Sequence, residues 1–141
     1  MDETEKCFLE GNLKKMQPSV DLAKKSIKQA RIFLQDALDL SELEKERMSI
    51  IALYNAFFHA SRALLFRDGI KERSHYCIAR YLEKFYFDKK ILPKEFLLNL
   101  DFLREIRHET QYSLEAVHLS RSIEDIAAIC EDFIDSVEKL L

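Results

Sequence analysis

The scarcity of chain breakers is the feature that most constrains how this sequence can fold. Only two glycines and two prolines occur among its 141 residues. The many tight turns of an all-β domain depend on these two residue types. The scarcity of glycine and proline therefore favours long helices. Apolar residues make up 48% of the sequence, which predicts a packed core rather than a disordered chain.

The apolar residues recur with helical spacing almost throughout, and no segment alternates with period two for long enough to be a strand. Capping-box spacing at Ser41 and Glu44, and again at Ser122 and Asp125, predicts two helix starts. Gly69 is placed as a left-handed helix cap. Together these signals predict helices over residues 3–15, 18–40, 41–67, 74–85, 93–111 and 122–140.

The length and the helix pattern together predict the architecture. A chain of this size matches one domain, so we expect residues 1–141 to form a single helical domain. We expect an all-α fold, an antiparallel up-and-down bundle of four main helices with shorter accessory helices.

Charge and cysteine content indicate where the protein works. The 22 basic and 25 acidic residues nearly balance, so any contact with RNA must come from a local patch. Three scattered cysteines without CxxC spacing, Cys7, Cys77 and Cys130, predict reduced thiols. The start "MDETEK" lacks the pattern of a signal peptide, and polar residues interrupt the apolar stretch 49–66. We therefore expect a cytoplasmic protein without a membrane segment.

An arginine–histidine doublet in "LREIRHETQYSLE" is the best entry to function. At about 100° per residue the apolar face of the helix over 93–111 contains Phe96, Leu97, Leu100 and Leu103. Arg107 falls inside this face, with Arg104 and His108 at its borders. An unpaired buried charge costs several kcal/mol, roughly. Two roles for Arg107 are therefore open. Its side chain either reaches solvent or pairs with a glutamate near the helix end, as a structural arginine does. Alternatively, it forms an anion site in a cleft.

The helix over residues 41–67 carries a second unusual polar feature. It is apolar nearly all round, which predicts a central position in the bundle. Asn55, His59 and Arg62 interrupt it at positions i, i+4 and i+7 and form one narrow stripe. This stripe is either a solvated edge or part of the same cleft as Arg107 and His108.

Other motifs are weaker. His75 and Cys77 point apart on a helix, and no second ligand pair is near, so we expect no metal site. The chain has no phosphate-binding glycine loop, dinucleotide fingerprint or nucleophile elbow, so we expect no cofactor. The basic loop over 67–75, which includes His75, is either solvated or steers a phosphate backbone.

Three segments in order resemble the HEPN superfamily of small helical-bundle proteins, in particular a poorly characterised prokaryotic branch. They are "CFLEGNLKKMQPSVDLAKKSIKQAR", "YNAFFHASRALLFRDGIKERSH" and "LREIRHETQY", which together cover most of the chain. The resemblance implies a homodimer in which two Arg-polar-x-x-x-His motifs share a cleft. Catalytic members are metal-independent endoribonucleases, often toxins neutralised by a minimal nucleotidyltransferase partner. A histidine base and an arginine suffice for that chemistry without a metal.

Carried over by residue, the resemblance places Arg107 at the motif arginine and His108 at the polar position after it. Tyr112 stands where the motif histidine is expected. Tyrosine is a poor general base at neutral pH because its phenol holds its proton there, whereas His108 is a neighbouring substitute. Leu114 occupies the place of a tyrosine that the partner modifies with nucleotides in some members, so this modification is not predicted.

Three functions remain open at this point. The favoured one is a dimeric subunit, paired with a nucleotidyltransferase, that holds a nucleotide or RNA phosphate in a cleft around Arg107 without cleaving it. The second is an endoribonuclease that uses Arg107, His108 and Tyr112 as catalytic residues. The third is a purely structural homodimer. The expected binding residues are Asn55, His59, Arg62, His75 and Arg104.

Overall fold

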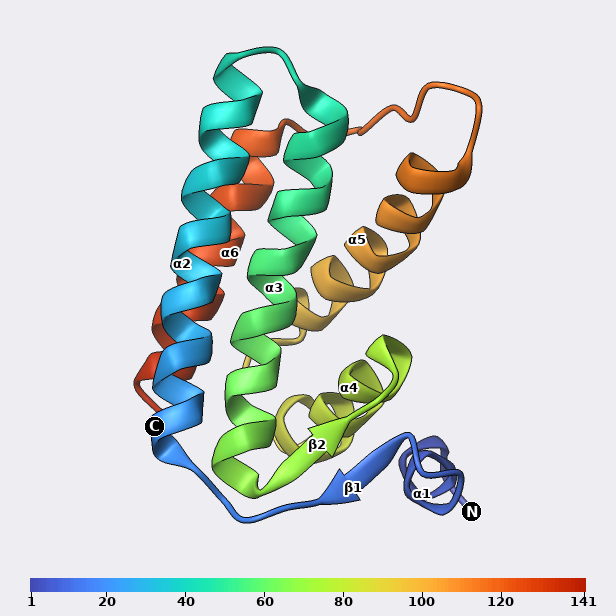
Figure 1. Cartoon of the computed structure of the whole chain (residues 1–141), viewed down its shortest axis with the longest axis vertical. Coiled ribbons are helices and arrows are strands. Elements are labelled where there is room, and N and C mark those ends of the chain that lie inside the picture. Colours follow the sequence, from blue (N-terminus) through green and yellow to red (C-terminus); the bar gives the residue numbers. More distant parts are fainter.

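The computed structural model describes all residues, 1–141, and is the helical bundle that the sequence predicts (Figure 1). Its four long helices are α2 (Val20–Glu42), α3 (Glu46–Asp68), α5 (Lys94–Tyr112) and α6 (Ile123–Glu138). The shorter elements are α1 (Glu3–Leu9), α4 (His75–Leu82), the π-helical turn η1 (Glu83–Phe87) and the strands β1 (Leu13–Lys15) and β2 (Ile70–Glu72). The all-α fold is confirmed.

Helix α3 lies at the centre of this arrangement, as its nearly uniform apolar character predicts. It packs against α2, α4, α5 and α6. In Figure 1, α5 leans away from α3 toward its C-terminal end, while α4 and the small sheet cover the opposite end of the bundle. Helix α3 is also long and apolar enough to cross a membrane, but 72% of its apolar window is buried inside the protein.

Serine caps fix three of the helix starts. Ser19, Ser74 and Ser122 each accept a hydrogen bond from the backbone N–H three residues later, which satisfies a donor that the helix leaves free. Gly69 has the predicted left-handed conformation, with φ of 79°. The predicted caps Gly69, Ser74 and Ser122 are confirmed, whereas α2, which was expected to begin at Pro18, begins at Val20 after the cap Ser19.

The predicted start of α3 at Ser41 is wrong. Helix α2 continues to Glu42, and the Ser41 hydroxyl donates to the Glu124 carboxylate at 2.7 Å instead of capping a helix. Glu44 has a φ of 60°, and α3 begins at Glu46 without a side-chain cap. A contact with α6 thus replaces the capping box that the spacing indicated.

Two short strands were not predicted, and the first helix is shorter than expected. Helix α1 ends at Leu9, after which β1 pairs antiparallel with β2, with Leu13 opposite Glu72 and Lys15 opposite Ile70. Strands of three residues are too short to give a period-two signal. Their partners come from distant parts of the chain, so local pattern does not reveal them.

The expectation of three reduced cysteines is also wrong. Cys7 of α1 and Cys77 of α4 form a disulfide across 70 residues, and only Cys130 is free. Helix α1 lies against α4, where the Thr4 hydroxyl donates to the Arg80 carbonyl at 3.0 Å. Docking of α1 on α4 brings the two sulfurs together, and cysteine spacing carries no information about that contact.

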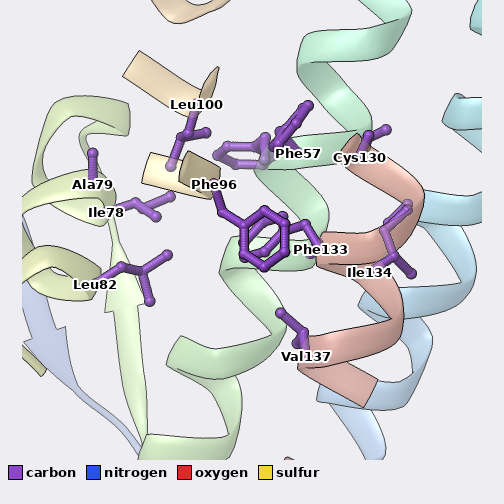
Figure 2. Packing of buried hydrophobic residues seen from close by; sticks show 14 of the residues in the cluster. Phe57, Ile78, Ala79, Leu82, Phe96, Leu100, Cys130, Phe133, Ile134 and Val137 are labelled. Carbon is purple, nitrogen blue, oxygen red and sulfur yellow. The ribbon is translucent and has the colours of Figure 1, made fainter. Parts of the chain in front are cut away.

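Three aromatic rings join the helices at the middle of the core. Phe57 of α3, Phe96 of α5 and Phe133 of α6 meet there, with Ile78, Ala79 and Leu82 of α4 beside them (Figure 2). The centroid of the Phe133 ring lies 5.7 Å from that of the Phe57 ring and 5.1 Å from that of the Phe96 ring. This contact holds the first turn of α5 against the bundle.

The Gly69 turn provides a stability prediction with an internal control. A Cβ at Gly69 would lie 2.7 Å from the Met16 carbonyl oxygen and 2.8 Å from Pro18 Cγ, whereas at Gly11, which has a similar φ, it would meet only Lys14 Cε at an ordinary contact distance of 3.6 Å. We expect Gly69→Ala to lower the free energy of unfolding by about 1–3 kcal/mol more than Gly11→Ala, because only Gly69 adds a steric overlap to the backbone strain. Urea denaturation of both variants measures this difference, and equal losses would contradict it.

Candidate functional site

Arg107 lies half-buried on the side of α5 that faces α3. Its guanidinium carbon is 4.9 Å from the centroid of the Tyr54 ring, a cation–π distance. One amino group, Nη1, donates to Gln111 Oε1 at 2.9 Å, and the buried Nε has no partner. Arg107 makes no ion pair, so its charge is not neutralised within the chain.

Tyr54 links Arg107 to His75. The Tyr54 hydroxyl is 2.8 Å from His75 Nδ1, and Phe58 stacks on the His75 ring with centroids 4.3 Å apart. Both aromatic rings belong to α3 and are buried, whereas His75 is half-buried in the first turn of α4. The three helices thus supply a continuous row of contacts. It runs from Phe58 of α3 to His75 of α4, then to Tyr54 of α3 and on to Arg107 of α5.

Two further arginines lie beside this row of contacts. Arg62 lies against the Phe58 and Phe66 rings and pairs with Glu72 at 2.9 Å. Arg104 lies against the Tyr76 ring, with a longer 3.5 Å pair to Asp101. We call the surface formed by Tyr54, Phe58, Arg62, His75, Arg104 and Arg107 the Arg107 patch.

The environment keeps the central groups of the patch uncharged. Burial, together with Arg107, Arg104 and Arg62, lowers the pKa of His75, so its ring is neutral at neutral pH. Burial raises the pKa of Tyr54 to about 12, against the opposing effect of Arg107 and Arg104. The Tyr54–His75 hydrogen bond therefore joins two neutral groups, and the positive charge of the patch resides on its arginines.

The polar stripe of α3 reaches the patch at one end only. His59 stacks on Phe33 of α2 and meets the Phe58 ring edge-on, and burial, with Arg62 and His75 nearby, lowers its pKa. Asn55 donates to the Ile51 carbonyl of its own helix and lines a separate hollow with Phe33. Of the three stripe residues, the structure thus places Arg62 in the patch, His59 behind it and Asn55 outside it.

His108 and Tyr112 are not brought to the patch. Their rings pair with each other, with centroids 4.8 Å apart, and both residues are exposed, Tyr112 at 71%. The doublet therefore separates, since Arg107 turns toward α3 while His108 stays on the solvent side of α5. This differs from the arrangement of catalytic residues that the sequence motif led us to expect.

None of the four principal hollows is lined by Arg107. The nearest along α5, about 470 Å³, lies between residues 44–50 and residues 110–117. Thr110 lines this hollow, and its buried hydroxyl has no partner. None of these four hollows is therefore the cleft that was expected around Arg107.

Sequence reasoning missed Tyr54 and Phe58 as parts of the site and treated them as core. Both are buried, as expected, but they also support the polar groups above them. A buried tyrosine normally needs a partner for its hydroxyl, and that requirement was the available signal. No group of three or more His, Cys, Asp or Glu side chains converges as metal ligands, and Cys77 belongs to the disulfide.

The fold and the patch define a small all-α domain with arginines mounted on buried aromatic rings. The family model of the HEPN domain matches residues 23–140, and the chain belongs to that family. The match leaves out α1 and β1, which the disulfide and the small sheet attach to the rest. No curated protein matches the chain in sequence.

Proposed function

We propose that this chain binds the phosphate of a nucleotide or RNA at the Arg107 patch without cleaving it. The observation that carries the proposal is the uncompensated charge of Arg107. Arg62, Arg80 and Arg104 all pair with carboxylates, but the only side-chain hydrogen bond of Arg107 is to the neutral Gln111. A partly desolvated guanidinium with free donors is suited to a phosphate, which it binds through parallel hydrogen bonds.

The aromatic support favours binding over a merely snorkelling arginine. Tyr54 holds the Arg107 guanidinium against its ring, which limits the motion that a phosphate contact would otherwise have to restrict. Arg104 and Arg62 lie in the same patch, but each pairs with a carboxylate, so the unpaired positive charge is that of Arg107. From membership of the HEPN family we also propose a homodimer, in which a second copy covers the Arg107 patch, paired with a minimal nucleotidyltransferase in the cytoplasm.

The position of the motif residues argues against RNA cleavage. A general base must lie within hydrogen-bonding reach of the 2′-hydroxyl next to the phosphate that the arginine holds. His108 and Tyr112 lie together on the exposed side of α5, and Tyr112 lacks the acid–base chemistry of a histidine. We therefore propose a binding function in place of an Arg107–His108–Tyr112 endoribonuclease.

Arg107→Ala tests the binding function. We expect about a 10–100-fold weaker affinity for a 3′-fluorescein-labelled single-stranded RNA, the effect of losing charge-assisted hydrogen bonds. Fluorescence anisotropy at low salt measures it. Arg31→Ala is the matched control, because it also removes one positive charge but from the α2–α6 side, where Arg31 pairs with Asp135 and Glu138.

Two results would overturn the proposal. One is an equal loss in both variants, or no binding by the wild type up to about 100 µM, the weak end of non-specific nucleic-acid affinity. The other is cleavage of the RNA by the wild-type protein that Arg107→Ala abolishes, which would establish the endoribonuclease instead.

A further inference from the structure

We propose that His75 takes up a proton when the Arg107 patch binds a phosphate, so that the patch selects a terminal phosphate monoester over the internal diesters of RNA. This inference rests on the proposed phosphate-binding function and names the ligand class of the same surface. It assigns a role to a histidine of α4, away from the α5 segment that carries the family motif.

The position of the His75 ring is fixed on two sides. Phe58 stacks on one face, and Tyr54 bonds to Nδ1 at 2.8 Å. Ser74 caps α4 directly before His75, which fixes the backbone as well. A histidine that served only to fill space between helices would not require a hydrogen-bonded, stacked ring at a half-exposed position.

The Tyr54 bond determines which ring nitrogen is available. Tyr54 is neutral, and a phenol O–H donates readily to an imidazole nitrogen, so we assign Nδ1 as the acceptor and place the ring hydrogen on Nε2. Nε2 makes no hydrogen bond within the protein. It can therefore donate to an anion held by Arg107. The proton that the ring takes up enters at Nδ1, so the Tyr54 hydroxyl turns from donor to acceptor of the same hydrogen bond and still keeps the ring in place.

The charges around His75 are nearly balanced. Arg62 is paired with Glu72, and Asp101 is shared between Arg80 and Arg104, with Glu83 also close to Arg80. Only Arg107 has no carboxylate partner. The titratable and charged groups that surround His75 are Tyr54, His59 and Arg62 of α3, Glu72 of β2, Arg80 of α4, and Asp101, Arg104 and Arg107 of α5.

This balance distinguishes two kinds of phosphate. An internal diester carries one negative charge, which Arg107 alone matches. A terminal monoester carries about 1.5–2 negative charges at pH 7, so it leaves a negative excess that a protonated His75 would neutralise. An anion within about 4–6 Å favours the charged form of a histidine, and it opposes the arginines that keep the free ring neutral. Binding of a monoester and protonation of His75 therefore strengthen each other.

The test compares two RNA octamers of one sequence, both labelled with fluorescein at the 3′ end, one with a 5′-phosphate and one with a 5′-hydroxyl. For the wild type at pH 6.5 we expect about two- to fivefold tighter binding of the 5′-phosphate RNA, because a pKa rise of one unit gives the full factor of ten only well below both pKa values. His75→Gln keeps a donor near the position of Nε2 but cannot take a charge, so we expect this preference to disappear. His118→Gln, in the exposed segment after α5, should retain it.

A second readout separates charge from structure. Calorimetric titration of the 5′-phosphate RNA in buffers of different ionisation enthalpy should show net proton uptake by the wild type and by His118→Gln. His75→Gln should show none, and its unfolding curve shows whether it is folded. Equal affinity for the two RNAs, or proton uptake that persists in folded His75→Gln, would overturn the inference while leaving the binding function intact. Failure of both RNAs to bind would overturn the proposed function itself.

Discussion

Phe133→Ala is expected to lower the free energy of unfolding by about 3–5 kcal/mol, the largest loss from a single substitution that we predict. Phe133 is fully buried, and its ring contacts Phe57 of α3 and Phe96 of α5 (Figure 2). Truncation removes the apolar contacts of three helices at once. The cavity cannot collapse easily, because each wall belongs to a different helix.

Chemical denaturation of two variants measures this effect. Phe102→Ala removes the same atoms from a position on α5 that is 36% exposed, and we expect it to cost no more than about 1 kcal/mol. A loss at Phe133 as small as that at Phe102 would show that the three-ring contact does not hold the bundle together.

Opening the Cys7–Cys77 disulfide is expected to cost about 2–4 kcal/mol of stability. The bond closes a loop of 70 residues, and a cross-link over such a length removes much of the conformational freedom of the unfolded chain. We expect oxidised wild type to lose this amount when a reductant is added. Cys7→Ser should be equally destabilised without reductant and should not respond to it.

A matched variant separates the effect of the disulfide on stability from the effect of the free cysteine. Cys130→Ala removes the free cysteine of α6 and leaves the disulfide, so its stability should still fall on reduction. Alkylation of the denatured protein followed by mass measurement counts free thiols directly. Three free thiols in protein that was purified without reductant would contradict the bond, as would a stability that does not depend on reductant.

The disulfide also bears on the patch. Cys77 lies two residues after His75 on α4, and α1 reaches α4 through Cys7 and Thr4. The N-terminal segment outside the matched HEPN region thus supports the helix that presents His75. Loss of the bond is expected to affect stability first, because Tyr54 and Phe58 hold the His75 ring independently of α1.

Arg107 shows that the angular spacing of residues in a helix can predict which side of the helix a side chain occupies. Angular spacing alone placed its side chain on the apolar face of α5, and the structure confirms that it turns toward α3 and packs on Tyr54. The same arithmetic put His108 just beside the face, where a few tens of degrees decide between core and solvent. The structure resolves this, since His108 is exposed.

The sequence by itself determined the local features of this protein. Helical periodicity, few chain breakers, serine caps and Gly69 act within a few residues of one another, and so they predicted the all-α bundle and several helix ends. The inward position of Arg107 also follows from spacing within one helix. These properties depend on short-range backbone and side-chain preferences, which neighbouring residues in the sequence determine.

Only the tertiary structure decided which distant residues meet. The Cys7–Cys77 bond, the β1–β2 pairing and the Ser41–Glu124 hydrogen bond join parts of the chain that sequence pattern treats as unrelated. The contact of His75 with Tyr54 is of the same kind, and it replaces the expected grouping of Arg107 with His108 and Tyr112. Such contacts arise from how whole helices pack, so no local pattern of residues specifies them.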